Sequence, residues 1–143
     1  MNLNKEQIQE IIPHRPPMLF VDEVLDLQPG VAIKAKFFIM PDWDIFTGHF
    51  PNAPVLPGVF GVEALAQTAS ILLLSMERYA GKIPYFIGID EVKFKKKILP
   101  GDTMIMEATI WKENVEKAVV TCEAAAYIGD DLATSGKVAL AMR

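Results

Sequence analysis

The sequence predicts an α+β fold in which an antiparallel sheet curls around one long, buried helix. Residues 59–79 are apolar around almost the entire circumference of a helix, which is typical of an enclosed element rather than a surface one. Four long strand candidates follow this segment, and only short turns separate them. Short connections between strands favour antiparallel pairing. Because the chain has 143 residues and no repeat or linker, we expect residues 1–143 to form a single domain.

The elements before the long helix are shorter. Residues 5–12 have the spacing of an amphipathic helix, with Asn4 as its N-cap. The prolines that follow end this helix, because proline lacks a backbone N–H and restricts φ. Strands are then predicted at 19–27 and 31–39, separated by a Pro-Gly turn. The loop at 41–57 is long for a compact domain, and ordered loops of this length are often functional.

After the long helix the pattern changes to that of extended strands. Gly81 is expected to end the helical region, since glycine commonly terminates helices. Clusters of turn residues then divide the rest of the chain, most clearly at Pro100-Gly101-Asp102 and Gly129-Asp130-Asp131. The predicted strands are residues 85–94, 103–111, 118–128 and 132–142.

Composition and charge exclude several classes of protein. Hydrophobic residues make up 51% of the chain, but polar residues interrupt every apolar run, so no membrane span is expected. The net charge of −4 argues against binding to nucleic acid. The first residues are polar and lack the basic-then-apolar pattern of a signal peptide. The lone Cys122 cannot form an internal disulfide, and together these features predict a cytoplasmic protein.

Residues 48–67 carry the clearest chemical pattern. His49 lies on a loop that prolines stiffen, and histidine can take or give a proton near neutral pH. Glu63 follows near the start of the long apolar helix, where poor solvation favours the protonated, proton-donating carboxyl. A base and an acid in a poorly solvated setting suit proton removal coupled to loss of a hydroxyl group. Taken alone, His49 would more commonly be a structural loop residue, whereas a buried carboxyl such as Glu63 has few structural explanations.

Two neighbours of this pair complete the pattern. Gly58 stands where the helix begins, so its amide is unpaired, is open to a ligand and lies at the positive end of the helix dipole. A carbonyl oxygen bound there would be polarised. Gln67 lies four residues after Glu63, on the same helical face, and is expected to orient the carboxyl by a hydrogen bond.

This segment resembles the active-site signature of the FabZ-type (3R)-hydroxyacyl-acyl-carrier-protein dehydratases of type II fatty acid synthesis. The resemblance extends to residues 12–22, Gly88-Ile89-Asp90, Lys93-Phe94 and Pro100-Gly101-Asp102, in the order of that family. Two departures are visible. Asn52-Ala53 stands where relatives commonly have Gly-Arg, and Lys95-Lys96-Lys97 replaces an Arg-Lys-Pro run; neither touches the expected chemistry.

The resemblance implies the hot-dog fold and a hydro-lyase that converts (3R)-hydroxyacyl-acyl carrier protein to the trans-2-enoyl form in the elongation cycle of fatty acid biosynthesis. It implies His49 as the catalytic histidine, Glu63 as the catalytic acid and Gly58 as the residue whose amide holds the thioester carbonyl. It also implies a homodimer in which each site takes its histidine and glutamate from different subunits. Relatives often assemble further, as trimers of dimers.

The remaining candidates concern substrate and carrier. Phe50, Val59 and Phe60 are candidate substrate-binding residues beside Gly58 and Gln67, and Phe86 is a further candidate for an acyl tunnel. For the aromatic side chains, ordinary core packing is an equally good interpretation. The strongest basic cluster, which would attract an acidic carrier protein but is also typical of a solvated strand end, consists of Lys93, Lys95, Lys96 and Lys97.

Neither a metal nor a cofactor is expected. The two histidines, His14 and His49, lie far apart in the chain, and one cysteine adds no ligand spacing. No glycine-rich phosphate loop occurs, and His14 is interpreted as structural. The alternatives are a hot-dog acyl thioesterase, a bifunctional dehydratase and isomerase, and a non-catalytic scaffold that binds acyl carrier protein. Related isomerases carry aspartate where this chain has Glu63, which favours simple dehydration.

Overall fold

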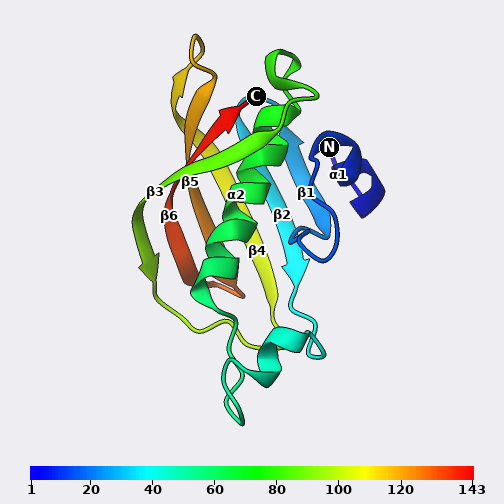
Figure 1. The fold of residues 1–143 in the computed structure, drawn as a ribbon, viewed down its shortest axis with the longest axis vertical. Helices are drawn as coiled ribbons and strands as arrows, with labels where there is room; N and C mark the ends of the chain where they lie inside the picture. Colours follow the sequence, from blue (N-terminus) through cyan, green and yellow to red (C-terminus); the bar gives the residue numbers. More distant parts are fainter.

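The computed structural model describes all 143 residues, as a six-stranded antiparallel sheet that wraps around helix α2 (Gly58–Leu74) (Figure 1). Helix α1 (Lys5–Ile11) lies at the side of the sheet where β1 forms the edge. The strand order is β1-β2-β4-β5-β6-β3. The predicted α+β class is therefore confirmed. The strands are β1 (Glu23–Gln28), β2 (Ala32–Phe38), β3 (Pro84–Phe94), β4 (Thr103–Asn114), β5 (Val119–Ile128) and β6 (Asp131–Met142).

Helix α2 is enclosed, as its composition predicts. Every residue from Gly61 to Leu74 except Glu63 is buried, against the sheet and the segments that flank it. The helix ends at Leu74, earlier than predicted, and a short 3₁₀ turn (Glu77–Tyr79) follows. The buried Tyr79 in that turn extends the apolar pattern beyond the true end of the helix, which explains the difference.

The beginning of the chain follows the sequence pattern closely at α1 and less closely at β1. Asn4 and Gln7 form a reciprocal capping box at the start of α1, and this confirms the predicted N-cap. Strand β1 begins at Glu23, although the pattern predicted a strand from residue 19. Residues 19–21 are buried, but the amide of Phe20 bonds to a side chain of α2 instead of to a neighbouring strand.

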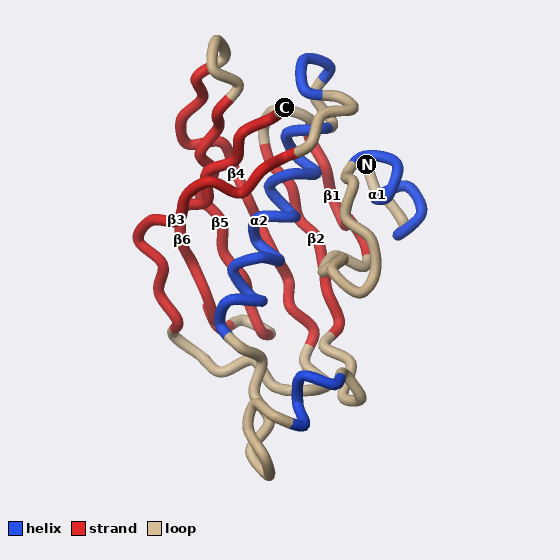
Figure 2. The backbone as a smooth tube through the Cα atoms, in the orientation of Figure 1, coloured by secondary structure: helices blue, strands red, loops and turns tan.

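The loops at one end of the molecule converge on the start of α2 (Figure 2). The chain between β2 and α2 contains a short 3₁₀ turn (Asp44–Thr47) and the His49 segment. The chain between β3 and β4 runs beside it, and the Leu56 amide donates to the Ile98 carbonyl at 2.8 Å. The predicted long loop is thus ordered and held to a second loop.

Strand β3 forms one edge of the sheet and pairs only with β6. Four of its apolar side chains are more than half exposed, with exposed fractions of 53% for Tyr85, 56% for Ile87, 60% for Ile89 and 59% for Phe94. A long edge strand with an exposed apolar face is a surface on which another strand can pair. None of the helices is long and apolar enough to span a membrane.

Candidate active site

His49 is fixed by hydrogen bonds from both its backbone and its ring. Its amide donates to the Ile45 carbonyl at 3.0 Å, and its carbonyl accepts from the Val55 amide at 3.0 Å. The ring nitrogen Nδ1 lies 2.8 Å from the Val55 carbonyl oxygen. The ring also stacks on Phe50, with ring centroids 3.9 Å apart. The imidazole therefore has little freedom to rotate.

The contact with Val55 also decides which ring nitrogen carries the proton. A carbonyl oxygen can only accept, so Nδ1 must donate to it. In the neutral ring Nε2 is then unprotonated and has a free lone pair. Such a ring is prepared to act as a base through Nε2, in the same way that a histidine oriented by a second group does in other acid–base sites.

Glu63 is the one residue between Gly61 and Leu74 of α2 that is not fully buried. Its side chain is 26% exposed, and Gln67 Nε2 donates to its Oε2 at 2.8 Å. This confirms the hydrogen bond predicted from the four-residue spacing. Burial raises the pKa of the Glu63 carboxyl above its ordinary value, and the hydrogen bond from Gln67 opposes part of that rise. The carboxyl is thus biased towards its protonated form.

Gln67 connects Glu63 to the segment before β1. Its side chain is fully buried, and its Nε2 also donates to the Met18 carbonyl at 2.8 Å. Its Oε1 accepts from the Phe20 amide at 2.7 Å. Since both ends of the amide are used, one side chain of α2 satisfies the backbone of a neighbouring segment and orients the carboxyl.

That same segment brings His14 to the carboxyl. The His14 Nε2 lies 3.8 Å from Glu63 Oε2, and its side chain is 22% exposed. Burial, followed by the positive charge of Arg15, lowers the pKa of the His14 imidazole. The sequence indicated only a structural role for His14, because nothing in its spacing places it beside Glu63.

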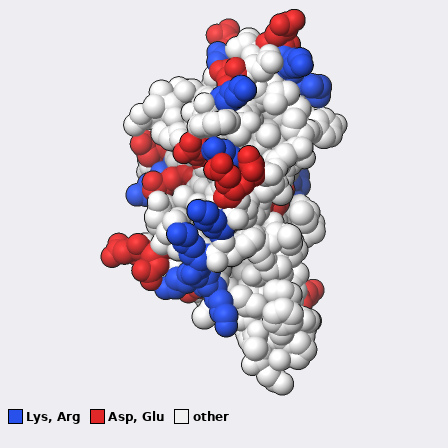
Figure 3. All heavy atoms as spheres, turned by 90° about the vertical axis from the view of Figure 1, so that its left-hand side faces the viewer, with Lys and Arg blue, Asp and Glu red and all other residues white.

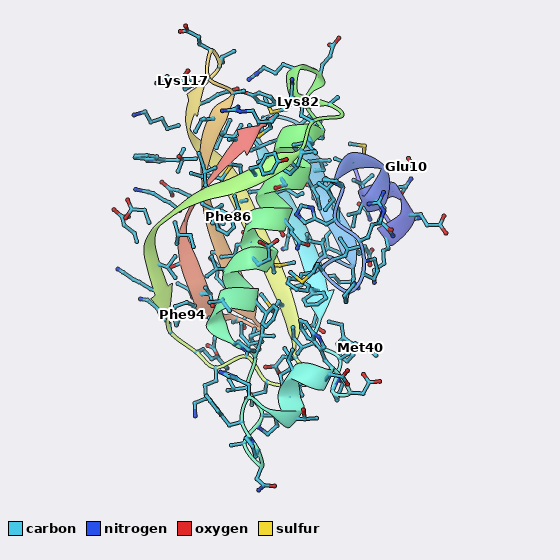
Figure 4. All side chains as sticks on the ribbon, viewed as in Figure 1. Glu10, Met40, Lys82, Phe86, Phe94 and Lys117 are labelled. Atoms are coloured by element: carbon cyan, nitrogen blue, oxygen red, sulfur yellow. The ribbon has the colours of Figure 1, made fainter.

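Gly58 is the first residue of α2, as predicted, and lines a cavity of about 540 Å³. Val59, Phe94 and Lys97 are among the other residues that line this cavity. The Phe94 ring lies so close to Gly58 that a Cβ at this position would come within 2.7 Å of it. In Figure 4, Phe94 stands at the end of β3 beside the start of α2, and Phe86 lies near the other end of the same strand. Only glycine fits here without moving the ring.

The lysine cluster divides into two parts. Lys95, Lys96 and Lys97 line the cavity at Gly58, whereas Lys93 lies in a hollow on the face of the sheet turned away from α2. Lys96 is paired with Asp131 at 2.7 Å, so Lys95 and Lys97 carry the uncompensated charge at the cavity. Figure 3 shows basic side chains gathered on the side of the molecule that carries β3.

The aromatic candidates have different environments. Phe60 packs against Phe20 and Trp43, with ring centroids 5.5 and 5.3 Å apart, and so belongs to a core cluster. Phe50 is 53% exposed beside His49, and Val59 is 72% exposed on the first turn of α2. Their roles in substrate binding stay predictions.

The single chain forms two clusters rather than one complete site. One contains His49, Phe50 and Val55, and the other contains Glu63, Gln67 and His14. No hydrogen bond or ion pair joins His49 to Glu63. No group of three or more His, Cys, Asp or Glu side chains lies close enough together to hold a metal ion.

Comparison with known proteins places the chain in a family. Residues 12–137 match the FabA-like domain. The FabZ 3-hydroxyacyl-[acyl-carrier-protein] dehydratase of Streptococcus uberis is 46% identical over 137 residues, which cover 96% of this chain and 96% of that protein. The FabZ protein of Oenococcus oeni is 49% identical over 114 residues, which cover 78% of this chain and 82% of that protein.

Solved structures agree on the fold. A dehydratase heterocomplex, ApeI:P from Xenorhabdus doucetiae, matches with a TM-score of 0.79 at 13% identity and covers 95% of this chain and 90% of that chain. An uncharacterized protein from Pyrococcus horikoshii matches with a TM-score of 0.71 at 12% identity, over 94% of this chain and 92% of that chain. The fold is thus the hot-dog fold, as expected. Within that class, the chain belongs to the FabA-like domain family and, inside it, to the FabZ-type dehydratases.

Proposed function

We propose that this chain dehydrates (3R)-hydroxyacyl groups carried by acyl carrier protein to trans-2-enoyl groups in fatty acid biosynthesis, with His49 as the base and Glu63 as the acid. The observation that carries these roles is the complementary preparation of the two side chains. The ring of His49 is held with Nε2 free to accept a proton, and the carboxyl of Glu63 is held where burial favours its protonated form.

The reaction begins with the thioester. Its carbonyl oxygen accepts a hydrogen bond from the Gly58 amide at the positive end of α2, which stabilises the negative charge that develops there. The α-proton becomes more acidic, and Nε2 of His49 removes it. The carbon–oxygen bond at the β-carbon breaks, and Glu63 transfers its proton to the departing hydroxyl. The products are water and the trans-2-enoyl thioester, and the same groups in exchanged roles catalyse the reverse reaction.

Each site would be completed by two copies of the chain. Support comes from the absence of a direct contact between His49 and Glu63 within one chain, and from the free, apolar edge of β3. Pairing of β3 with the same strand of a second copy, about a two-fold axis, would cover exposed side chains such as Ile87 and Ile89. The cluster that contains Glu63 in one subunit would then face the cluster that contains His49 in the other. Such dimers could assemble further into trimers of dimers.

The carrier protein would dock beside the cavity at Gly58. Lys95 and Lys97 have no ion-pair partner there, and an acidic carrier would be steered towards them. Phe50 and Val59 would contact the arriving acyl group. The proposal includes a single functional domain over residues 1–143, which the one buried hydrophobic cluster supports. It also includes a cytoplasmic location and catalysis without a cofactor.

The test is turnover of 3-hydroxyacyl carrier proteins of graded chain length, with products identified by mass spectrometry. His49→Ala and Glu63→Gln are expected to lower turnover by about 10²–10⁴-fold each, because each removes one catalytic proton transfer. Glu116→Gln, the same change at an exposed position on the β4–β5 hairpin, is the matched control and should keep full activity. Near-normal turnover in either site variant would refute the assigned roles. Release of a free thiol instead of an enoyl product would indicate a thioesterase.

A further inference from the structure

His14 and Glu63 lie close together, yet burial favours the uncharged form of both side chains. At 3.8 Å the two groups are near enough for an ion pair, and both side chains are about three-quarters covered. An ion pair would keep the carboxyl charged. A charged Glu63 could not donate a proton, so a positive charge on His14 would oppose a role as an acid for the neighbouring carboxyl.

The surroundings of His14 oppose its positive charge in three ways. First, its Nδ1 is buried and has no hydrogen-bond partner. A protonated ring carries N–H groups on both nitrogens, so protonation would leave one buried donor unsatisfied. Second, the Arg15 guanidinium is fixed beside the ring by three backbone carbonyls, those of Gln9, Ile12 and His14. Third, burial itself disfavours the cation, and the pKa of His14 is lowered accordingly.

The groups that face the pair are few. Arg15, next to His14 in the segment after α1, acts on the imidazole through its positive charge, and Gln67 of α2, which is neutral, donates to Glu63 Oε2. No other charged side chain forms a hydrogen bond or an ion pair with either member. Burial therefore acts on both residues in the same direction, towards an uncharged imidazole beside a protonated carboxyl.

We propose that His14 is a positioning residue that stays uncharged and thereby keeps Glu63 in its proton-donating form. This inference rests on the proposed function, since it gives His14 a purpose only if Glu63 is the acid. The His14 ring covers one side of the Glu63 carboxyl without supplying a positive charge that would favour loss of its proton. A lysine or arginine at position 14 would cover the carboxyl equally well but would stabilise the carboxylate.

The first test needs no substitution at position 14. In NMR spectra of the isotope-labelled enzyme, the ring signals of His14 should be those of a neutral imidazole throughout the neutral pH range. Glu63→Gln should change that titration little, because no ion pair is lost. A His14 ring that is charged at neutral pH, or that loses its charge only when Glu63 is replaced, would overturn the proposal.

The second test varies the charge at position 14 and follows the Glu63 carboxyl directly, with its signal assigned by comparison with Glu63→Gln. His14→Gln, which is uncharged, should leave the Glu63 titration close to that of the unaltered enzyme. His14→Lys should lower it by about one pH unit or more, because an opposite charge within this distance favours the carboxylate. Gln28→Lys, at the exposed end of β1, controls for added charge and should have no effect.

The same variants separate this inference from the proposed function. In His14→Lys the alkaline limb of the kcat/KM profile should move to lower pH, whereas a purely structural defect would lower activity at every pH. An unmoved carboxyl titration in a folded His14→Lys variant contradicts the inference. So does an equal shift in His14→Gln. If the titration moves but turnover does not depend on Glu63, the pairing stands and the assignment of Glu63 as the acid falls.

Discussion

Replacing Gln67 by leucine tests the connection between α2 and the segment before β1. Leucine has a similar volume and stays apolar in a fully buried position, so packing is largely kept and hydrogen bonds are removed. The Phe20 amide loses its acceptor inside the protein, and the Met18 carbonyl loses a donor at a site that water can partly reach. A buried group left without a partner costs about 1–3 kcal/mol, so the expected loss is about 2–4 kcal/mol. That is a large fraction of the 5–15 kcal/mol that is typical of a whole domain.

The assay is urea unfolding at a fixed protein concentration, followed by tryptophan fluorescence. Trp43 is a suitable reporter because it packs against Phe20, with ring centroids 5.4 Å apart. Gln28→Leu makes the same change at an exposed position and should alter the free energy of unfolding by less than about 0.5 kcal/mol. If Gln67→Leu is as mild as Gln28→Leu, the hydrogen bonds assigned to Gln67 do not hold this segment. The hydrogen bond from Gln67 lowers the pKa of Glu63, so its loss should also move the alkaline limb of the activity profile to higher pH.

Three further predictions follow from the same geometry. The pKa of Glu63 is raised on folding, so its contribution to stability is full below the unfolded pKa and is lost as pH rises through the folded value. In thermal melts, the Tm of Glu63→Gln should therefore rise relative to that of the unaltered protein as the pH increases from acid to neutral. A difference in Tm that is constant with pH contradicts this. Gly58→Ala should lower turnover by up to about 10²-fold, because its Cβ, within 2.7 Å of the Phe94 ring, forces a shift of about 1 Å at the site; an unchanged rate would show that the amide position is not critical. Lys97→Glu should raise KM for the carrier-linked substrate in a salt-dependent way, whereas Lys117→Glu at the far hairpin should not, and equal effects would place docking elsewhere.

The sequence patterns predicted the parts of the fold that local rules control. The enclosed character of α2, the capping box at Asn4 and the hydrogen bond between Glu63 and Gln67 all depend on spacing within one helix. The separation of Lys93 from Lys95 and its neighbours was not predicted. Side chains two positions apart share a face of a strand, so a continuous strand would place Lys93 and Lys95 together, but β3 ends at Phe94 and Lys95 lies outside it.

The remaining features depend on contacts between distant parts of the chain. Gln67 binds the Phe20 amide from 47 positions away, and the apolar pattern of residues 19–21 gives no sign of this long-range bond in place of strand pairing. The ring of His49 is oriented by the Val55 carbonyl. Every residue has a backbone carbonyl, so the sequence does not show which one accepts this hydrogen bond. His14 reaches Glu63 only because the segment that carries it is held against α2.

Mixing the two inactive variants tests most directly the claim that one site uses His49 and Glu63 from different subunits. In a dimer of one His49→Ala chain and one Glu63→Gln chain, one site carries both substitutions and the other carries neither. Random exchange makes half of the dimers mixed, so we expect about one quarter of normal turnover to return. Turnover no higher than that of the separate variants, when native mass spectrometry shows that the subunits have exchanged, would contradict the account.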